Sequence, residues 1–510
     1  MKSKEKQSVK QFLNIVEHIG NKLPHPVTMF IILCAAVVIL SEVLSILEVS
    51  VEFEKINTAD GSVSTSSVFC VSLFNADGLR YILTNAVKNF IEFAPLGSVL
   101  TAMLGVAVAD GTGLISTALR KIVVTAPSHL ITFVVVFAGI ISNLASDVGY
   151  VILIPLGGMI FHSVGRHPIA GISAAFAGVS GGFSANLLLS TLDPMLSGLT
   201  SEAASVIDPF YSVSPACNWY FIIVSTFIIT IIGSLVTEKI VEPRLGEYNK
   251  TKVNIEDITA SENKGLIAAG ITAVIYTAII FALCATNVLT NQTTGSLIEN
   301  SPFMDSIVTL VALFFIICGL SYGVCTGKFR SDKDVVETAS AGMAALGGYL
   351  VLAFFSAQFV NYFSYTNIGT IAAVKGAEIL KTTGFTGLPL IIAFIFLCSV
   401  INLFMGSASA KWAIMAPIFV PMFMSIGLAP ELTQIAYRIG DSVTNIISPL
   451  MSYFSMIIAV AQKYDKNCGL GTIISSMLPY SLFFAAGWTV QLIIWYIFNL
   501  PLGPGANMFI

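Results

Sequence analysis

Charged side chains are scarce in this sequence. Asp, Glu, Lys and Arg make up 11% of the 510 residues, whereas a soluble domain carries about 25%. Hydrophobic residues account for 55%, and they gather in stretches of about 20 residues, the length of a membrane-spanning helix. The scarcity of charge therefore excludes water as the main solvent of this chain. It predicts an all-α, polytopic membrane protein embedded in a lipid bilayer.

Several motifs for metal binding, catalysis and nucleic-acid binding are also missing. The eight cysteines lie singly, with no CxxC pair, and none of the five histidines belongs to an HExxH motif. The net charge is −4 and there is no basic run, which argues against nucleic acid as a partner. No cluster of histidines at membrane depth offers a general base or a metal site. These absences disfavour a membrane-embedded enzyme.

Nine stretches are long enough to be full transmembrane helices, and two further stretches do not fit single crossings. Residues 129–163 and 388–425 are each about twice as long as one span, and ISNLASDVGY and MGSASAKW break them centrally. A polar break inside an apolar stretch predicts a re-entrant hairpin, because exposed backbone groups cannot be left facing lipid. The nine predicted spans cover residues 27–47, 91–112, 168–192, 218–236, 265–286, 306–326, 338–362, 434–460 and 471–497.

Basic residues predict the orientation, since cytoplasmic loops carry an excess of Lys and Arg. The first 26 residues are polar and Lys-rich, which predicts a cytoplasmic segment and no cleavable signal peptide. The other basic clusters fall on the same side if the first hairpin enters from the cytoplasm and the second from outside. We therefore expect a multi-pass protein of the cytoplasmic (inner) membrane with its N-terminus inside and its C-terminus external. These clusters lie at residues 120–121, 166, 239–264, 328–333 and 463–466.

The two hairpins begin the two halves of an internal repeat. A span with Ser, Asn, Asp and Pro follows each, FSANLLLSTLDPMLSG in the first half and GDSVTNIISPLMS in the second. Opposite entry makes the repeat inverted, as in secondary transporters whose interrupted helices meet near the midplane. The predicted organisation is a cytoplasmic segment (1–26), scaffold helices (27–128 and 218–326), the first hairpin with a broken helix (129–200), a helix with the second hairpin and a broken helix (338–460), and a last helix with the C-terminus (471–510).

Five ionisable residues fall inside the predicted membrane: Asp147, Asp193, Lys411, Arg438 and Asp441. Each costs about 2.5–3.5 kcal/mol at a helix centre. Arg438 and Asp441 are three residues apart and can neutralise each other on one helix face. Lys411 can snorkel to the outer surface, and Asp147 can cap a hairpin arm or bind an ion. Asp193 has no basic neighbour within a helical turn, so a functional role is favoured for it.

Four blocks carry a likeness to a known family. They are SDVGYVILIPLGGMIFHSVGRHPIAGISAAFAGVSGGFSANLLLSTLDPMLSGL, SAKWAIMAPIFVPM, YRIGDSVTNIISPLMSYF and, near the N-terminus, IGNKLPHPVTMF. Together they resemble the AbgT family of aminobenzoyl-glutamate transporters. The resemblance implies an inner-membrane homodimer, with nine transmembrane helices and two re-entrant hairpins in each subunit and an elevator-type architecture. Residues that the family needs match Asp193, Trp412, Pro430, Arg438 and Asp441, whereas the stretch after Ser146 and Asp147 departs from other members.

The resemblance also implies a substrate, p-aminobenzoyl-glutamate or a sulfonamide antimetabolite, and coupling to the proton motive force or to sodium. Arg438 and Lys411 suit carboxylates. Trp412 suits stacking on an aromatic ring or, as an alternative, an interfacial belt. The candidate substrate-binding residues are Trp412, Arg438, Asn445, Asn186, Lys411 and Ser409; the candidate ion-coupling residues are Asp193, Asp441, Asn143, Ser142 and Ser407; the expected hinge prolines are Pro430, Pro417 and Pro155.

The expected function is secondary active transport of a small anionic aromatic substrate, with H⁺ or Na⁺ as coupling ion and no other cofactor. Carbonyls of the broken helices beside Asn143, Asn186 and Asn445 can hold Na⁺. A Na⁺-coupled dicarboxylate or short-peptide carrier shares all of these features and stays open as an alternative, and so does a channel.

Overall fold

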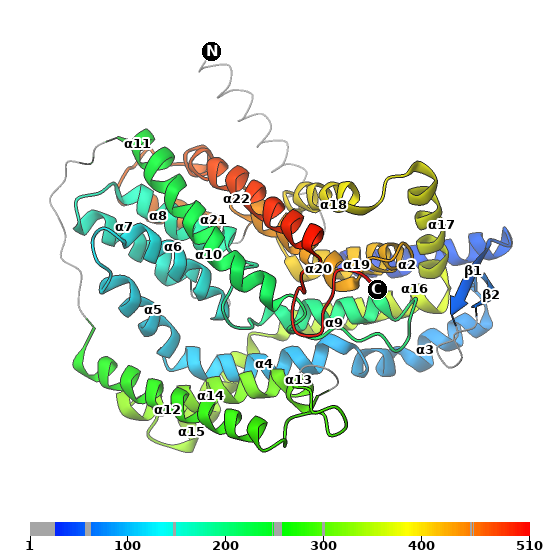
Figure 1. Ribbon diagram of the computed structural model, residues 1–510, viewed down its shortest axis with the longest axis horizontal. Helices are drawn as coiled ribbons and strands as arrows, with labels where there is room; N and C mark the ends of the chain where they lie inside the picture. Colours follow the sequence, from blue (N-terminus) through cyan, green and yellow to red (C-terminus); the bar gives the residue numbers. More distant parts are fainter. Residues whose placement is uncertain are drawn as a thin grey trace, which may run out of the picture.

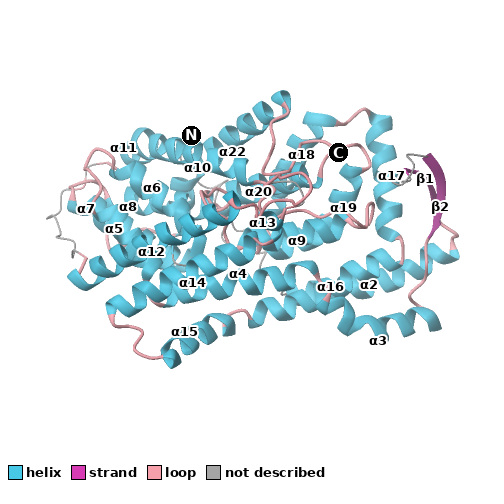
Figure 2. Cartoon of the chain, turned by 60° about the horizontal axis from the view of Figure 1, so that its bottom comes forward, coloured by secondary structure: helices cyan, strands magenta, loops and turns pink. Residues whose placement is uncertain are grey.

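A computed structural model describes residues 26–56, 63–145, 149–246, 248, 258–297, 301–448, 451 and 453–510. Most of the described chain is helical (Figures 1 and 2). The elements in chain order are α2 (Pro26–Ile46), β1 (Ser50–Ile56), β2 (Val63–Phe69), α3 (Ala76–Ile91), α4 (Ala94–Gly111), α5 (Leu114–Val124), α6 (Ile131–Ile141), η1 (Ser142–Ala145), η2 (Gly149–Leu153), α7 (Ile154–Ser163), α8 (Pro168–Phe176), η3 (Ala177–Gly181), α9 (Leu192–Ala204), α10 (Trp219–Val236), η4 (Thr237–Val241), α11 (Glu242–Leu245), α12 (Ala260–Ala285), α13 (Pro302–Asp305), α14 (Ile307–Thr326), α15 (Asp332–Ala344), α16 (Gly347–Tyr365), α17 (Ile368–Thr383), α18 (Gly387–Asn402), α19 (Ala408–Met424), α20 (Pro430–Asn445), α21 (Phe454–Gln462) and α22 (Leu470–Phe498).

Six helical segments of the described chain are long and apolar enough to cross a membrane. The expected span 338–362 straddles α15 and α16, which meet at a 45° bend and give a seventh crossing only if the pair counts as one. Nine spans therefore stay a prediction. The six segments are Val27–Ile46, Ala76–Gly111, Trp219–Leu245, Ala260–Ala285, Ile307–Thr326 and Leu470–Phe498.

The stretch expected as the first hairpin folds into two short helical arms. α6 ends at Ile141, where Ser142 Oγ donates to Gly139 O (2.6 Å) and Asn143 Nδ2 donates to Ile140 O (3.1 Å). These side chains satisfy carbonyls that a helix end leaves open. The second arm, η2 and α7, carries Pro155 in the first turn of α7, where a missing N–H is tolerated. Each arm is too short to cross a bilayer alone.

The stretch expected as the second hairpin folds in the same way, as α18 and α19 joined by residues 403–407. Ser407 caps α19 by accepting a hydrogen bond from Ala410 N (3.3 Å). The prolines at positions 417 and 421, expected to break the backbone, lie inside α19, which continues to Met424. Their effect is thus a pair of missing N–H donors within one helix.

Both spans that follow the hairpins are interrupted. The span expected at 168–192 is not continuous, because its helix ends at Gly181 and a new helix, α9, begins at Leu192. The span expected at 434–460 is likewise divided into α20 and α21. Neither stretch is therefore one continuous helix, and the expectation of two full-length spans there is wrong.

Small residues let several helices approach closely. A Cβ placed on Gly105 of α4 would lie 2.4 Å from Ala312 O of α14, so only glycine fits there.

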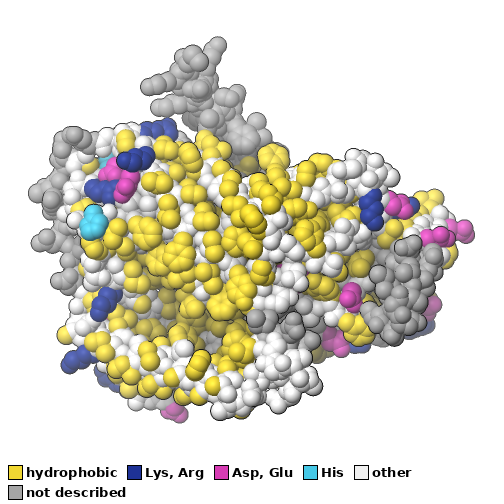
Figure 3. Space-filling view, viewed as in Figure 1, with side chains coloured by type: hydrophobic (Ala, Val, Ile, Leu, Met, Phe, Trp, Pro, Cys, Tyr) yellow, Lys and Arg dark blue, Asp and Glu magenta, His cyan; other side chains and the backbone are white. Residues whose placement is uncertain are grey.

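α4, α12, α14 and α15 lie together along the bottom of Figure 1, while α6, α8, α10 and α22 lie in its upper part. Figure 3 shows a face covered mainly by hydrophobic side chains, with the charged groups mostly near its edges. This distribution suits a surface in contact with lipid.

Four elements were missed by the sequence analysis, and one expected boundary was wrong. β1 and β2 pair antiparallel from Ser50↔Phe69 to Ile56↔Val63, so the fold is mainly helical and not purely all-α. α5 and α17 are short helices that a search for 20-residue apolar stretches passes over. The span expected at 91–112 belongs to a longer segment, because α3 extends it back to Ala76.

Candidate functional site

The ionisable residues that the sequence placed in the membrane meet in two buried ion pairs. α9 supplies Asp193, α19 supplies Lys411, and α20 supplies both Arg438 and Asp441. All four side chains are at most 2% exposed. The second hairpin and the two broken helices therefore come together around these charges. Asp147 lies outside the described residues.

The first pair joins the two broken helices. Arg438 Nη1 donates to Asp193 Oδ1 at 2.5 Å, and Asp193 Oδ2 accepts from the backbone N (2.5 Å) and Oγ (2.8 Å) of Ser190. Asp193 stands in the first turn of α9, where the helix dipole favours a carboxylate. Arg438 Nε, in contrast, is buried without a hydrogen-bond partner among the described residues. The guanidinium thus has an unused donor.

The second pair joins the second hairpin to α20. The Lys411 ammonium donates to Asp441 Oδ1 and to Asn402 Oδ1. Asn402 Nδ2 donates in turn to Asp441 O (2.6 Å) and Asn445 Oδ1 (2.8 Å), and Asn445 Nδ2 donates to Asp441 Oδ2 (3.3 Å). These four residues connect both arms of the hairpin to α20. Asn402 was missed, although an asparagine that closes the apolar run of α18 is itself a signal.

Two structural alternatives considered for the sequence are wrong. Arg438 does not pair with Asp441 on its own helix, because each of them binds a residue of another element. Lys411 does not snorkel to a surface, since its side chain is 1% exposed. Tertiary packing offers these groups partners at hydrogen-bonding distance, and a charge that is fully desolvated needs such partners.

Trp412 is completely buried and already has partners within the protein. Its ring stacks on Tyr437 with a centroid distance of 4.5 Å and an interplanar angle of 26°. Its indole Nε1 donates to Thr200 Oγ1 of α9 at 2.9 Å. A place in an interfacial belt is therefore excluded. Stacking on a ligand requires this arrangement to open.

Comparison with known proteins identifies the family. A sequence model of the AbgT transporter family matches residues 11–510. The chain is 38% identical to the p-aminobenzoyl-glutamate transport protein of Escherichia coli (strain K12) over 492 residues, which are 96% of this chain and 95% of that protein. This chain belongs to the AbgT transporter family. It is accordingly a transporter and not an enzyme, and its apolar helices agree with a multi-pass membrane protein.

Two solved structures resemble this AbgT transporter closely. The structure of MtrF from Neisseria gonorrhoeae, which illuminates a class of antimetabolite efflux pumps, gives a TM-score of 0.91 at 50% identity and covers 97% of this chain and 100% of that one. The YdaH transporter of Alcanivorax borkumensis, which has an unusual topology, gives 0.88 at 44% identity and covers 94% of this chain and 100% of that one.

A chain of buried polar side chains extends the site of this AbgT transporter beyond Trp412, and the sequence analysis missed it. Thr200 Oγ1 donates to Gln434 Oε1 (2.6 Å), and Gln434 Nε2 donates to Asn218 Oδ1 (2.9 Å). Asn218 Nδ2 donates to Glu431 O (3.0 Å). α9, α20 and the start of α10 are thereby fixed to one another. These hydrogen-bonded residues lie far apart in the sequence, so no local motif indicates them. The one hint is that several polar residues of α20 are buried.

The remaining site predictions divide between the two repeats. Asn143 and Asn186 meet at Ile140 O (3.1 and 3.5 Å), which joins the first hairpin to the first broken helix. Asn143 Oδ1 is buried without a partner among the described residues. Asn445 belongs instead to the Lys411 cluster. The other candidates lie at the hairpin tips or in the helix turns already described: Ser142, Ser407 and Ser409.

The prolines expected as hinges have different positions. Pro155 lies in the first turn of α7, Pro417 lies inside α19, and Pro430 is the first residue of α20. The residue before Pro430, Ala429, donates its N–H to Met508 O (3.1 Å). The segment after α22 thus packs on the connection between the second hairpin and the second broken helix.

Proposed function

We propose that this transporter moves p-aminobenzoyl-glutamate, or a related aromatic folate-type or sulfonamide-like anion, across the cytoplasmic membrane. A gradient of H⁺ or Na⁺ drives the movement. The observation that carries the proposal is the pair of buried salt bridges, Arg438 with Asp193 and Lys411 with Asp441. The name of the relative from Escherichia coli supplies the substrate class, and the gonococcal relative adds the antimetabolites.

Arg438 is the proposed carboxylate receptor. Its Nη1 holds Asp193, while its Nε has no partner among the described residues. A substrate carboxylate can accept from this fork in place of Asp193, because a guanidinium binds carboxylates through two parallel N–H groups. The substrate thereby replaces an internal carboxylate, so that the buried arginine keeps its counter-charge throughout.

Coupling follows from the displaced acid. Once Arg438 binds the substrate, the carboxylate of Asp193 is buried without a cation, and it must take up a proton or a Na⁺ ion. In the same way, Asp441 must take up a proton or a Na⁺ ion when it loses its contact with Lys411. Binding of the anion and binding of the coupling ion therefore favour each other, which is the thermodynamic requirement for coupled transport.

The proposed architecture is an elevator-type carrier in a homodimer, with nine spans and two re-entrant hairpins in each subunit. In it the hairpins and broken helices form a transport domain that moves against the scaffold helices. The N-terminus is cytoplasmic and the C-terminus is external. The support is the arrangement of the second hairpin and the two broken helices around the buried charges, together with the inverted repeat that the sequence predicts.

The experiment is flux of radiolabelled p-aminobenzoyl-glutamate into proteoliposomes, with the Na⁺ gradient and the pH gradient imposed separately. We expect accumulation with one of the two gradients and none with both dissipated. Asp193→Asn should abolish accumulation, whereas Asp77→Asn, a removal of an exposed carboxylate in α3, should leave it intact. Full gradient-driven flux in Asp193→Asn protein would refute the coupling role.

Competition separates this cargo from the other carrier classes. An excess of unlabelled p-aminobenzoyl-glutamate should inhibit the labelled flux much more than citrate or a dipeptide at the same concentration. Stronger inhibition by citrate or by the dipeptide would point to a dicarboxylate or short-peptide carrier. Equilibration without accumulation under both gradients would point to a channel.

A further inference from the structure

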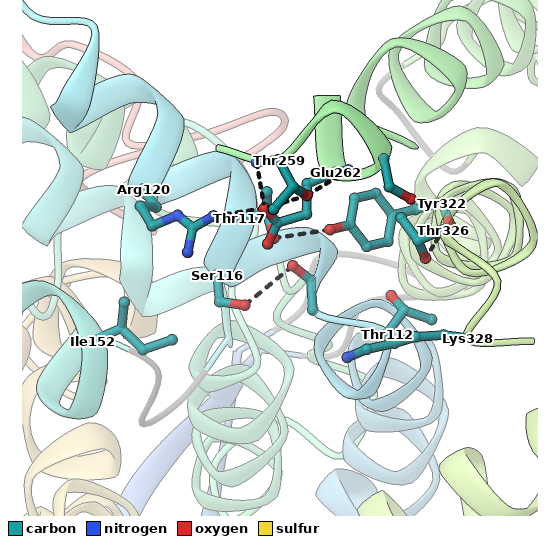
Figure 4. A pocket seen from close by; sticks show the side chains of 12 residues that line it. Thr112, Ser116, Thr117, Arg120, Ile152, Thr259, Glu262, Tyr322, Thr326 and Lys328 are labelled. Carbon is teal, nitrogen blue, oxygen red and sulfur yellow. Dashed lines mark hydrogen bonds and ion pairs between the residues drawn. The ribbon is translucent and has the colours of Figure 1, made fainter. Parts of the chain in front are cut away.

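A cavity of about 460 Å³ lies apart from the buried ion pairs. It opens between α5, the beginning of α12 and the end of α14, with Ile152 of η2 on a further side (Figure 4). Its volume is within the range of sites that hold drug-sized ligands. None of the candidate transport residues described above lines it.

Basic groups face each other across this cavity. Figure 4 shows the Lys328 side chain with its amino end directed toward Ser116, and Arg120 on another side of the cavity. Lys328 has no ion-pair partner within 4 Å in the described part of the chain. The Arg120 guanidinium binds Glu262 through Nη2 (2.7 Å), yet its Nε is buried without a partner there. Two positive groups therefore retain donors for a ligand.

Among the described residues that line the cavity, Glu262 is the single carboxylate, and it is already neutralised. Glu262 Oε2 accepts from Arg120 Nη2 and also from the backbone N and Oγ1 of Thr259 (2.9 Å each), because Glu262 is the N3 residue in the capping box that begins with Thr259, the N-cap of α12. Arg120 and Glu262 cancel in charge, which leaves Lys328 in excess. The described lining of the cavity therefore favours an anion.

Backbone and hydroxyl groups complete the lining. α5 begins at Leu114 behind Gly113, which has φ +84° and no side chain to cap the first turn. A Cβ at Gly113 would lie 3.3 Å from Lys328 Nζ, so glycine leaves room for the ammonium over this helix end. Ser116, Thr117 and Tyr322 add hydroxyl groups, which suit a ligand with further polar atoms.

The cavity lies between the scaffold helices and the transport domain of the proposed carrier. α5, α12 and α14 border it on the scaffold side, and η2 belongs to the first hairpin. Arg120 and Lys328 both belong to basic clusters that the positive-inside rule assigns to the cytoplasmic face. A ligand in this cavity would thus come from the cytoplasm and would touch both parts.

We propose that this cavity is a second anion-binding site, which receives a small carboxylate-bearing aromatic molecule on the cytoplasmic side, separately from Arg438. The inference rests on the proposed function for the class of molecule. Lys328 and Arg120 bind the carboxylate, and the hydroxyl-lined wall holds the remaining polar atoms. Such a site raises the local concentration of cargo next to the first hairpin.

The test is protection of Lys328 from an amine-acylating reagent, followed by mass spectrometry of the full-length protein in phosphatidylcholine nanodiscs. Lys328 is exposed and should react freely without ligand. With p-aminobenzoyl-glutamate at about two-thirds occupancy, its labelling rate should fall roughly threefold. Lys333, exposed and paired with Glu337 at 3.6 Å, is the internal control and should not change. Equal rates for Lys328 with and without ligand overturn the proposal.

Asp193→Asn protein distinguishes this site from the transport site. The proposed function predicts that this variant loses coupled flux, whereas protection of Lys328 should persist in it. Loss of protection together with flux would mean that the cavity has no affinity of its own, and this overturns the proposal. Failure of wild-type flux with protection intact would refute the proposed function alone.

Two further measurements test which molecule occupies the cavity. Inorganic phosphate at the same concentration should protect Lys328 less than p-aminobenzoyl-glutamate does, and equal protection would overturn the assignment to an aromatic carboxylate. Protection already present in phosphatidylglycerol nanodiscs without ligand would assign the cavity to a lipid headgroup and overturn the proposal.

In flux assays, Lys328→Gln should raise KM about threefold with kcat unchanged, and Lys333→Gln should leave both unchanged.

Discussion

Asp193 and Arg438 are 245 residues apart in the sequence, and in the structure their side chains touch at 2.5 Å, buried to 1% and 2% exposure. This contact joins α9 to α20. Together with the Lys411–Asp441 pair it places all the described intramembrane charges in cross-element partnerships. The site is closed in this conformation, because none of these charges reaches solvent.

The Asp193–Arg438 pair should behave as a buried ion pair in stability measurements. Asp193→Asn and Arg438→Gln should each destabilise the protein by about 3–5 kcal/mol, since each leaves an uncompensated buried charge. The double variant should recover a large part of this loss. Thermal unfolding of the purified protein in detergent measures the three changes. Strictly additive losses in the double variant would contradict the pairing.

The charge of Lys411 should be stabilised in the folded protein by Asp441 and not by water. Lys411→Met should lower the thermal midpoint strongly, because it leaves Asp441 and Asn402 Oδ1 without their shared donor. Lys411→Met with Asp441→Leu should be more stable than Lys411→Met alone. Lys381→Met, which changes a lysine near the end of α17, is the control. A Lys411→Met variant as stable as this control would mean that the ammonium is solvated.

Thr200 should position Trp412. Thr200→Val removes the acceptor of the indole N–H at nearly constant volume and should cost about 1–3 kcal/mol, because a buried donor is left unsatisfied. Thr277→Val on α12, whose hydroxyl donates to Ala273 O of its own helix, should cost much less. The measurement is again the thermal midpoint. Equal effects of the two substitutions would show that the 2.9 Å contact contributes nothing.

Gly440 should be intolerant of any side chain. A Cβ there would lie 2.5 Å from Ile395 O and from Cys398 Cβ, so Gly440→Ala should push α18 away from α20 and cost several kcal/mol. Gly348→Ala meets nothing within 4 Å and should be neutral or slightly stabilising. Folded yield and midpoint by size-exclusion chromatography and thermal unfolding test this. A folded Gly440→Ala protein with wild-type stability would contradict the close packing.

Much of the fold follows from local composition. Where a polar tip within a long apolar stretch predicted a re-entrant hairpin, the structure has one helical arm before and one after the tip, at residues 142–148 and at residues 403–407. Re-entry into the membrane stays a prediction. The broken helices were predictable from Ser, Asn and Pro inside apolar spans. β1, β2, α5 and α17 were not found, because their apolar residues do not form the 20-residue stretches on which the search depended.

The members of the site were largely predictable, and their partners were not. Residue type and expected depth in the membrane alone singled out Asp193, Lys411, Arg438 and Asp441. A charged side chain in lipid costs free energy, and such residues are rare there unless they have partners or a function. Asn402, Thr200, Gln434 and Asn218 carry no charge, and a polar amide or hydroxyl in an apolar helix has many ordinary explanations. Their roles depend on which helix faces which.

The sequence by itself determined that this protein is a mainly helical membrane protein and which charged residues it buries, since both properties follow from the free energy of solvation of each residue. Only the tertiary structure decided that Arg438 binds Asp193 and not Asp441, that Lys411 is enclosed, and that Trp412 stacks on Tyr437. Those choices depend on contacts between segments up to 245 residues apart, and a contact energy exists only once packing has brought both partners to hydrogen-bonding distance.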